Sequence, residues 1–408
     1  MTATEGGGQD LLTGVRVLDF SQFYAGPVSG RILAEMGAEV ILLEQAGRID
    51  PTRQMTTIGG VDFSTPQGRN LLFDGVSRGK KSVCIDLKTD RGRQAVYRLV
   101  KSSDVFHTNY RSSTLSDAGL DYPTLSQINP RLIYSRVSGF GPKGPLKDER
   151  AFDFAIQGFS GMMSAMGNED GELAPPLILS VDQTTGMLGA YSIVAALLHR
   201  ERTGFGQEVH TSLLGTAVQM LYFHFLSVFH GNKLEKHSRI QPGNALRNYY
   251  RCGDGQWLIC AHNPKERYWR SFSEALGLKD APSEEGLRGA GGDSELTQIL
   301  DKVFATKPRE EWLKLGQQHG LVFVPVNSVQ EAAVQEQVLA NYAEDEVTVE
   351  GRSRSPGFCT HFAKTPVRGR GKAPELGEHT EEVLRTVAGY SEAEVRALKE
   401  EGVIRTSG

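Results

Sequence analysis

Short apolar segments alternate with helical ones between residues 15 and 137, and this alternation constrains the fold more than any other feature of the sequence. Val15–Phe20 and Glu39–Glu44 have the composition of buried strands, and between them Pro27 opens a helical pattern that Gly37 ends. Strands buried on both faces are typical of parallel sheets. These residues therefore predict a βαβ unit at the start of a parallel sheet.

The same alternation continues along the chain. Three more strands are expected, at Ser82–Asp86, Asp104–Thr108 and Arg131–Val137. Helices are expected between them, over Asp90–Lys101 and Leu115–Ile128. The pattern predicts an α/β fold with a doubly wound sheet.

A change in composition after Gly231 indicates a second, smaller domain. A chain of 408 residues is long for a single core, so two domains are expected. Beyond Gly231 the sequence mixes polar residues, Gly and Pro, and then predicts a strand at Gln256–Ala261 and a helix at Glu266–Leu276. Residues 231–330 are expected to form a small α+β domain, whereas 345–408 is loop-rich and then helical.

Bulk properties exclude several functional classes. The net charge of -4 provides no basic field that would attract nucleic acid. No apolar run is long enough for a membrane-spanning helix, and Met1–Asp10 is polar and Gly-rich, unlike a signal peptide, so a cytoplasmic location is expected. The four cysteines form no CxxC pair, which argues against a zinc site or a disulfide framework, and no metal site is expected.

The turn after the first strand argues against a nicotinamide dinucleotide. A dinucleotide-binding turn needs the pattern Gly-x-Gly-x-x-Gly, because the backbone must approach a pyrophosphate closely. Here the turn holds the bulky residues Phe23 and Tyr24. Residues 78–82 contain a Gly-Lys pair but lead into a strand, so they do not form a P-loop either.

Asp182 follows a β-rich run at Leu177–Val181 and precedes a helical pattern at Gln183–Arg202. One interpretation is an N-cap, since Asp is a preferred residue there. The other is a nucleophile, because the helix dipole favours an ionised carboxylate that can attack an activated acyl carbon. The glycine-rich segments 138–141 and 157–161 then offer oxyanion or substrate contacts, although tight turns and close packing explain glycines equally well. These candidates are Gly139, Gly141, Gln157 and Gly158.

Ten short motifs, in order along the chain, resemble those of the class III CoA-transferases, the family that includes formyl-CoA transferase, carnitine CoA-transferase and α-methylacyl-CoA racemase. They are Gly14–Phe20, Ala25–Pro27, Leu33–Val40, Lys80–Lys88, Asn109–Arg111, Asn129–Tyr134, Ser138–Gly141, Asp182–Gly186, Arg202–Gln207 and Leu376–Thr380. Each motif is weak by itself, whereas the ordered set is specific and spans nearly the whole chain.

The resemblance implies a Rossmann-like large domain built from both chain ends, a smaller inserted α+β domain, and an interlocked homodimer. The large domain would comprise 1–230 and 345–408, with the linker and small domain at 231–344. A pairing with a paralogous chain is left open.

The resemblance also implies a reaction. Coenzyme A would move from an acyl-CoA thioester to a free carboxylic acid through an aspartyl-acyl anhydride and an aspartyl-CoA thioester on Asp182. CoA thioesters would be substrates, and no permanently bound cofactor is expected.

Residues at matching positions would contact CoA. They are Phe23, Tyr24, Ala25, Ile85, Leu87, Lys88, Asn109, Tyr110, Arg111 and Phe140, with Lys88 and Arg111 near phosphates and Phe23 or Tyr24 against adenine. Formyl-CoA transferase has arginines where Gln45 and Asp117 stand here, so the phosphates must be held differently in this chain.

Two alternatives remain open beside the transferase. The racemase pattern is Gly-His-Asp, but the matching run here is Ala151-Phe152-Asp153, which weakens an acyl-CoA racemase or isomerase that acts at the α-carbon. An inactive partner subunit is the third possibility, and Asp182 argues against it. The sequence does not identify the donor acid or the acceptor acid. The glycine-rich loop of formyl-CoA transferase is missing, which argues against oxalate. A bulky or carboxylated acid would suit the side chains of Arg247, Tyr249, Tyr250 and Arg251.

Overall fold

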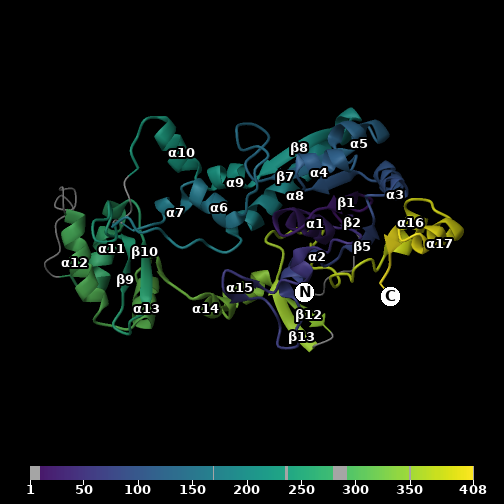
Figure 1. Cartoon of the computed structure of the whole chain (residues 1–408). Coiled ribbons are helices and arrows are strands. Elements are labelled where there is room, and N and C mark those ends of the chain that lie inside the picture. Colours follow the sequence, from purple (N-terminus) through teal and green to yellow (C-terminus); the bar gives the residue numbers. More distant parts are fainter. Residues whose placement is uncertain (1–9, 169, 235–237, 279–291, 349–350, 408) are drawn as a thin grey trace. The chain divides into compact units, whose positions relative to one another are not determined.

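The computed structural model describes residues 10–168, 170–234, 238–278, 292–348 and 351–407 (Figure 1). The chain divides into two compact units. The large unit comprises Met1–Met162, Pro175–Asn232 and Tyr342–Gly408, and the small unit comprises Met163–Ala174 and Lys233–Asn341.

A seven-stranded sheet forms the centre of the large unit, in the order β14-β5-β2-β1-β6-β7-β8. Its strands are β1 (Arg16–Phe20), β2 (Glu39–Gln45), β5 (Lys81–Ile85), β6 (Val105–Thr108), β7 (Ile133–Ser138), β8 (Gln207–Ser212) and β14 (Ile404–Arg405). All neighbouring pairs are parallel except β14 with β5, which is antiparallel. The predicted α/β class and the five predicted strands are confirmed.

The chain order of the parallel strands is that of a doubly wound sheet. Across the sheet from β5 to β8, the strands come third, second, first, fourth, fifth and sixth along the chain. The direction of winding therefore reverses between β1 and β6. In sheets of this kind, ligands bind at the carboxyl ends of the strands beside that reversal.

Helices cover both faces of this sheet. One face packs its apolar side chains, including Leu18 and Phe106, against α3 (Asp90–Lys101), α5 (Tyr122–Ile128), α16 (Thr380–Thr386) and α17 (Glu392–Glu400). The other face packs residues such as Val17 and Val105 against α1 (Ala25–Glu35) and α8 (Ser180–Thr203). Because successive strand residues point to opposite faces, both sets must be apolar, which explains the unbroken apolar strands.

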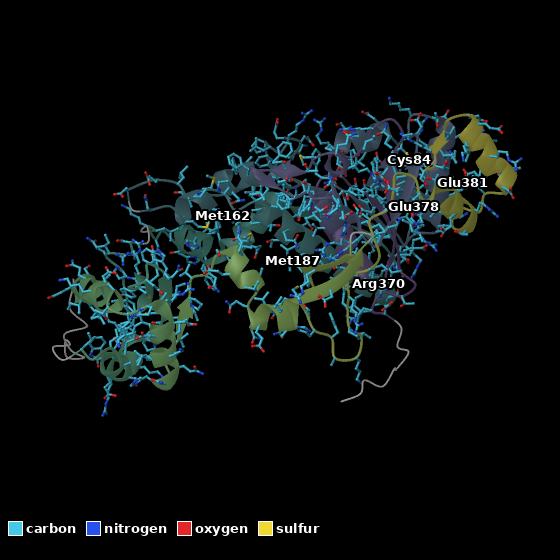
Figure 2. The ribbon with its side chains drawn as sticks, turned by 90° about the horizontal axis from the view of Figure 1, so that it is seen from below. Cys84, Met162, Met187, Arg370, Glu378 and Glu381 are labelled. Atoms are coloured by element: carbon cyan, nitrogen blue, oxygen red, sulfur yellow. The ribbon has the colours of Figure 1, made fainter. Side chains whose placement is uncertain are left out.

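The carboxyl-terminal segment contacts β5, and its last strand, β14, forms the edge of the sheet beside β5. The His379 amide donates to the Ser82 carbonyl at 2.9 Å, and the Cys84 amide donates to the Thr380 hydroxyl at 3.1 Å. Figure 2 labels Cys84, which belongs to β5, close to Glu378 and Glu381, which belong to the carboxyl-terminal segment. The last residues of the chain therefore complete the sheet that the first residues begin.

One expectation about local structure is wrong, and a second segment differs only in detail. The run Leu177–Val181 is not a strand, because α8 already begins at Ser180. The segment Leu115–Ile128 is mostly helical, as expected, but it forms two helices, α4 (Ser112–Asp117) and α5, and Gly119 lies between them with a φ of 67°. Helices of L residues do not continue through a left-handed φ.

The remaining elements of the large unit are short. They are the 3-10 helix Pro51–Arg53, β3 (Thr57–Ile58), β4 (Val61–Asp62), α2 (Leu71–Ser77), α6 (Asp153–Phe159), α9 (Leu213–Met220), α10 (Tyr222–Phe229), β12 (Ala343–Thr348) and β13 (Gly351–Pro356). At the junctions between the units lie α7 (Met162–Ala165) and α15 (Glu336–Tyr342).

The small unit has an antiparallel sheet in the order β11-β10-β9. Its elements are β9 (Arg247–Arg251), β10 (Trp257–Ala261), β11 (Phe323–Pro325), α11 (Lys265–Leu276), α12 (Gly292–Phe304), α13 (Arg309–Gln318) and α14 (Val329–Ala333). Aromatic side chains such as Trp269, Phe272 and Trp312 fill its core. The expected strand at Gln256–Ala261 and the expected helix at Glu266–Leu276 are confirmed.

Within the described ranges, no helix is both long and apolar enough to cross a membrane. The same part of the chain holds no group of three or more His, Cys, Asp or Glu side chains that could bind a metal ion.

Candidate active site

A cavity of about 350 Å³ lies at the carboxyl ends of β1, β6 and β7. Its lining residues, which define the switch-point cavity, are 22–25, 48, 109–111, 114, 136–139, 147–152 and 182. The segments that follow β1 and β6 both contribute, so the cavity occupies the position where a doubly wound sheet binds its ligand.

Only some of the site residues predicted from the sequence line the switch-point cavity. Those that line it are Asp182, Phe23, Tyr24, Ala25, Asn109, Tyr110, Arg111 and Gly139. The others do not line it. Ile85 and Leu87 are buried in the core of the large unit, and Lys88 is exposed beyond β5.

The turn between β1 and α1 is held in an unusual backbone conformation. Phe23 has a φ of 62°, which a bulky L residue rarely adopts. Asn109 fixes the preceding residue from both sides, because it accepts from the Gln22 amide at 3.0 Å and donates to the Gln22 carbonyl at 2.7 Å. The Phe23 amide donates to Asp50 at 3.3 Å. These contacts let Phe23 and Tyr24 line the cavity despite the strain.

A buried ion pair lies next to this turn. Lys80 and Asp19 are both fully buried, and Lys80 Nζ donates to Asp19 Oδ2 at 2.8 Å and to the Pro27 carbonyl at 2.9 Å. The Ser21 hydroxyl donates to the other Asp19 oxygen at 2.5 Å. Because these partners come from β1, α1 and the residue before β5, they tie the turn to the sheet.

Asp182 is the third residue of α8, not its N-cap. Leu179 occupies the N-cap position with a φ of 57°, and no side chain of its own caps the helix. Asp153 does so instead: its Oδ2 accepts from the Val181 amide at 2.7 Å and from the Asp182 amide at 2.9 Å. The N-cap interpretation of Asp182 is therefore wrong, and no hydrogen bond is found for its carboxyl group among the described residues.

Burial, together with a smaller effect of the negative charge of Asp153, raises the pKa of Asp182 to about 7. This result corrects the expectation that the helix dipole keeps the carboxylate strongly ionised. Burial disfavours the charged form, and Asp153 already occupies the amide groups that would have stabilised it. A strongly perturbed carboxyl group in a cavity is characteristic of a functional site.

The glycine-rich segments show mainly structural roles. A Cβ at Gly139 would come within 2.3 Å of the Ala151 Cβ, so glycine lets these two lining segments approach each other. Gly141 adopts a φ of 98° in a turn. Phe140 packs edge-on against Phe159 at 5.3 Å.

Gln157 and Gly158 lie on α6, and neither lines the switch-point cavity. Gln157 is buried, and its Nε2 donates to Asp153 at 2.5 Å and to the Leu177 carbonyl at 2.7 Å. Both amide hydrogens are thereby used within the protein. Gly158 is exposed.

Phe152 stands where a racemase would have histidine. It is 62% exposed, lines the switch-point cavity and packs edge-on against Phe23 at 6.2 Å. None of the residues that line this cavity is a histidine. A phenyl ring cannot exchange a proton, so this wall of the cavity offers apolar contact only.

Several basic lining residues were not singled out from the sequence. They are Arg48, Arg136, Lys147 and Arg150. Arg136 lies on β7, and its buried Nε has no hydrogen-bond partner among the residues that the structure describes. A charged residue inside an apolar strand is a signal that could have identified Arg136, whereas the others are ordinary loop residues in the sequence.

A second cavity of about 560 Å³ shares Arg136, Lys147 and Asp148 with the first and extends to Glu208 and His210. Burial, with the nearby Arg136, lowers the pKa of His210 to about 4, so this histidine is neutral at pH 7.

In the small unit, Arg247 lines a separate cavity of about 510 Å³ with Asn244 and Asn263. Tyr249 is partly exposed at 38%, whereas Tyr250 is fully buried and donates its hydroxyl to the Ala245 carbonyl at 2.6 Å. Tyr250 is therefore a core residue, and the expectation that it contacts substrate is wrong within this unit.

Comparisons with known proteins find a matching family, similar sequences and a similar structure. The sequence profile of CoA-transferase family III matches residues 12–380. The chain is 31% identical over 404 residues to succinyl-CoA:glutarate CoA-transferase of Mus musculus, which covers 96% of this chain and 90% of that protein. It is 30% identical over 416 residues to the succinyl-CoA–L-malate CoA-transferase alpha subunit of Chloroflexus aurantiacus, covering 98% and 95%. The crystal structure of a CAIB/BAIF family protein from Brucella suis aligns with a TM-score of 0.79 at 26% identity, covering 93% and 100%.

Proposed function

The chain belongs to CoA-transferase family III and is a class III CoA-transferase, and from this premise we propose that Asp182 is the nucleophile that carries the acyl group and then CoA. The observation that supports this most is the position of Asp182. Its carboxyl group belongs to a cavity at the switch point of the sheet and has a pKa near 7. A carboxylate of that basicity is a stronger nucleophile than an ordinary one, yet half of it is ionised at neutral pH.

The proposed reaction has four balanced steps. The Asp182 carboxylate attacks the acyl carbon of the donor thioester, which forms an aspartyl-acyl anhydride and expels CoA thiolate. The thiolate attacks the aspartyl carbonyl, which forms an aspartyl-CoA thioester and releases the donor acid. The acceptor carboxylate attacks that thioester and expels the thiolate, forming a second anhydride. The thiolate then attacks the acceptor acyl carbon and regenerates the Asp182 carboxylate.

The lining residues suit both parts of a CoA thioester. Phe23, Tyr24 and Tyr110 offer aromatic surface for the adenine, and Arg48 and Arg111 offer positive charge for phosphates. Arg48 follows Gln45 in a turn in which its amide donates to the Gln45 carbonyl at 3.1 Å. We therefore assign to Arg48 the phosphate contact that an arginine at position 45 would otherwise make.

A second copy of the chain is the proposed partner. In α8, the exposed fractions of Met187 (labelled in Figure 2), Tyr191 and Leu198 are 41%, 71% and 54%. In α10, no side chain is buried, and Phe223 and Phe229 are both 77% exposed. Apolar surface of this extent is typical of a permanent interface. Size-exclusion chromatography with light scattering should give twice the chain mass, and a monomeric mass would contradict the proposal.

Covalent labelling tests the nucleophile. Incubation with an acyl-CoA donor should leave an acyl or CoA adduct on the peptide that contains Asp182, detected by mass spectrometry. Asp182→Ala should lower turnover about 1000-fold or more. Glu201→Gln, which changes an exposed acid at the far end of the same helix, is the matched control and should retain activity. Full transfer activity in Asp182→Ala would exclude the proposal.

The racemase alternative has a separate test. Phe152 cannot take part in proton exchange at the α-carbon. Acyl-CoA incubated with enzyme in deuterium oxide, with no acid acceptor, should therefore acquire no deuterium at that carbon. Incorporation at a catalytic rate would restore the alternative. A screen of acyl-CoA donors against free acids would then identify the substrate pair.

A further inference from the structure

We propose that Asp153 is a positioning residue for the transfer reaction: its carboxylate caps the first turn of α8, holds Asp182 in place and sets a second negative charge beside it. This inference rests on Asp182 being the nucleophile. It goes further by assigning a role to a side chain that itself does not touch the acyl group.

The contact geometry is specific. Asp153 is the first residue of α6, and it is buried, with an exposed fraction of 6%. One carboxylate oxygen accepts from the amides of Val181 and Asp182, and the other accepts from Gln157. All three partners are donors, which an ionised carboxylate satisfies fully. The cap therefore reaches the backbone of the nucleophile itself.

Gln157 locks this arrangement from the opposite side. Its amide nitrogen bridges Asp153 and the Leu177 carbonyl, and its oxygen accepts from the Leu177 amide at 3.1 Å. Leu177 lies just before Leu179, whose left-handed backbone turns the chain into α8. The position of Asp182 thus depends on a buried network that no residue of α8 could provide alone.

The same contact has an electrostatic consequence. Free amide groups at a helix start favour negative charge, but two of them are committed to Asp153. Repulsion from Asp153 adds to burial in raising the pKa of Asp182. The cap that positions the nucleophile therefore also keeps it basic.

Other titratable groups line the same cavity as Asp182. They are Tyr24, just before α1; Arg48, Arg111 and Arg136, which lie in or after neighbouring strands; and residues 147–150, which carry two acidic and two basic side chains. Because substitution at position 153 leaves all of them in place, a change in the titration of Asp182 reports on Asp153.

Two matched variants separate charge from structure. Asp153→Asn keeps an oxygen acceptor for the two amides and removes the charge, so the ionisation midpoint of Asp182 should fall by roughly 0.5–1 pH unit. Gln157→Met removes a hydrogen bond to Asp153 but leaves its charge, so it should lower kcat while the midpoint stays. Asp153→Ser is measured in parallel as a second neutral variant, and circular dichroism checks that each protein is folded.

The midpoint is measured in two ways. The acid limb of kcat/KM is recorded with succinyl-CoA as the probe donor, and the carboxyl carbon of Asp182 is titrated by ¹³C NMR, with its signal identified by its loss in Asp182→Asn. Unchanged midpoints in both neutral variants would overturn the role of Asp153. If Asp182→Asn retained full activity, the proposed function would fail, while the NMR titration would still report on Asp153.

Discussion

Two helices of the large unit begin with opposite kinds of cap. In α17, Ser391 accepts from the Glu394 amide, and Glu394 accepts from the Ser391 amide, so the first turn satisfies itself. In α8, the cap comes from Asp153, 29 residues before Asp182 along the chain. In the local cap of α17, the carboxylate of Glu394 is engaged in a hydrogen bond within its own helix. The remote cap leaves the carboxyl group of Asp182 without a hydrogen bond among the described residues.

Of the two caps, the remote one should have the larger effect on stability and activity when it is removed. Asp153→Ala leaves two amides of α8 without an acceptor, and we expect the free energy of unfolding to fall by about 2 kcal/mol. Because Asp182 also loses its fixed position, kcat/KM should fall roughly 10–100-fold. Urea unfolding and steady-state kinetics measure the two effects. A drop in stability with unchanged kinetics would show that the two helix starts do not differ in function.

Removal of the free acid should change stability in a pH-dependent way. The pKa of Asp182 is about 7 in the folded protein, above the ordinary aspartate pKa of 3.8, so the wild type loses stability as pH rises from about 4 to about 7. Asp182→Asn removes that loss. Its advantage over wild type should be small at pH 4 and reach about 2 kcal/mol at pH 8, less than the full pKa difference would give, because Asp182 is only partly buried and solvent screens its charge. Unfolding at both pH values tests this, and an equal difference at both would contradict it.

Catalysis should show the matching pH dependence. If attack needs the ionised form of Asp182, kcat/KM should decrease about tenfold for each pH unit below about 7. A stopped assay between pH 5 and pH 9 would record this limb. A profile that stays flat down to pH 5 would indicate that Asp182 is not the group that must ionise.

Removal of the local cap should have the smallest effect. Ser391→Ala removes the side-chain hydroxyl that accepts from the Glu394 amide at the start of α17, and the free energy of unfolding should fall by about 1 kcal/mol. Turnover should not change, because α17 contributes no residue to the switch-point cavity. Ser391→Thr, which keeps the hydroxyl, is the control. A loss of activity in Ser391→Ala beyond its loss of stability would break the distinction between the two caps.

Much of the fold was predictable because its signals are local. Apolar strands such as Glu39–Gln45 must be buried on both faces, and the intervening helices are amphipathic, so the α/β class follows from short windows of sequence. The ordered motifs likewise predicted the family. Errors occurred where neighbours far along the chain compete with local preference, as at Leu177–Val181, where Asp153 starts the helix earlier than composition suggests.

The sequence by itself determined the class of fold, the family and Asp182 as the residue of interest. Only the tertiary structure decided the environment of Asp182: the residue is partly buried, its backbone amide donates to Asp153, and the pKa of its carboxyl group lies near 7. It also decided that Arg48 and Arg136 line the cavity and that Leu87 does not. The physical reason is range. Backbone preference and periodicity act over a few residues, whereas burial, charge and remote caps depend on which distant segments the fold brings together.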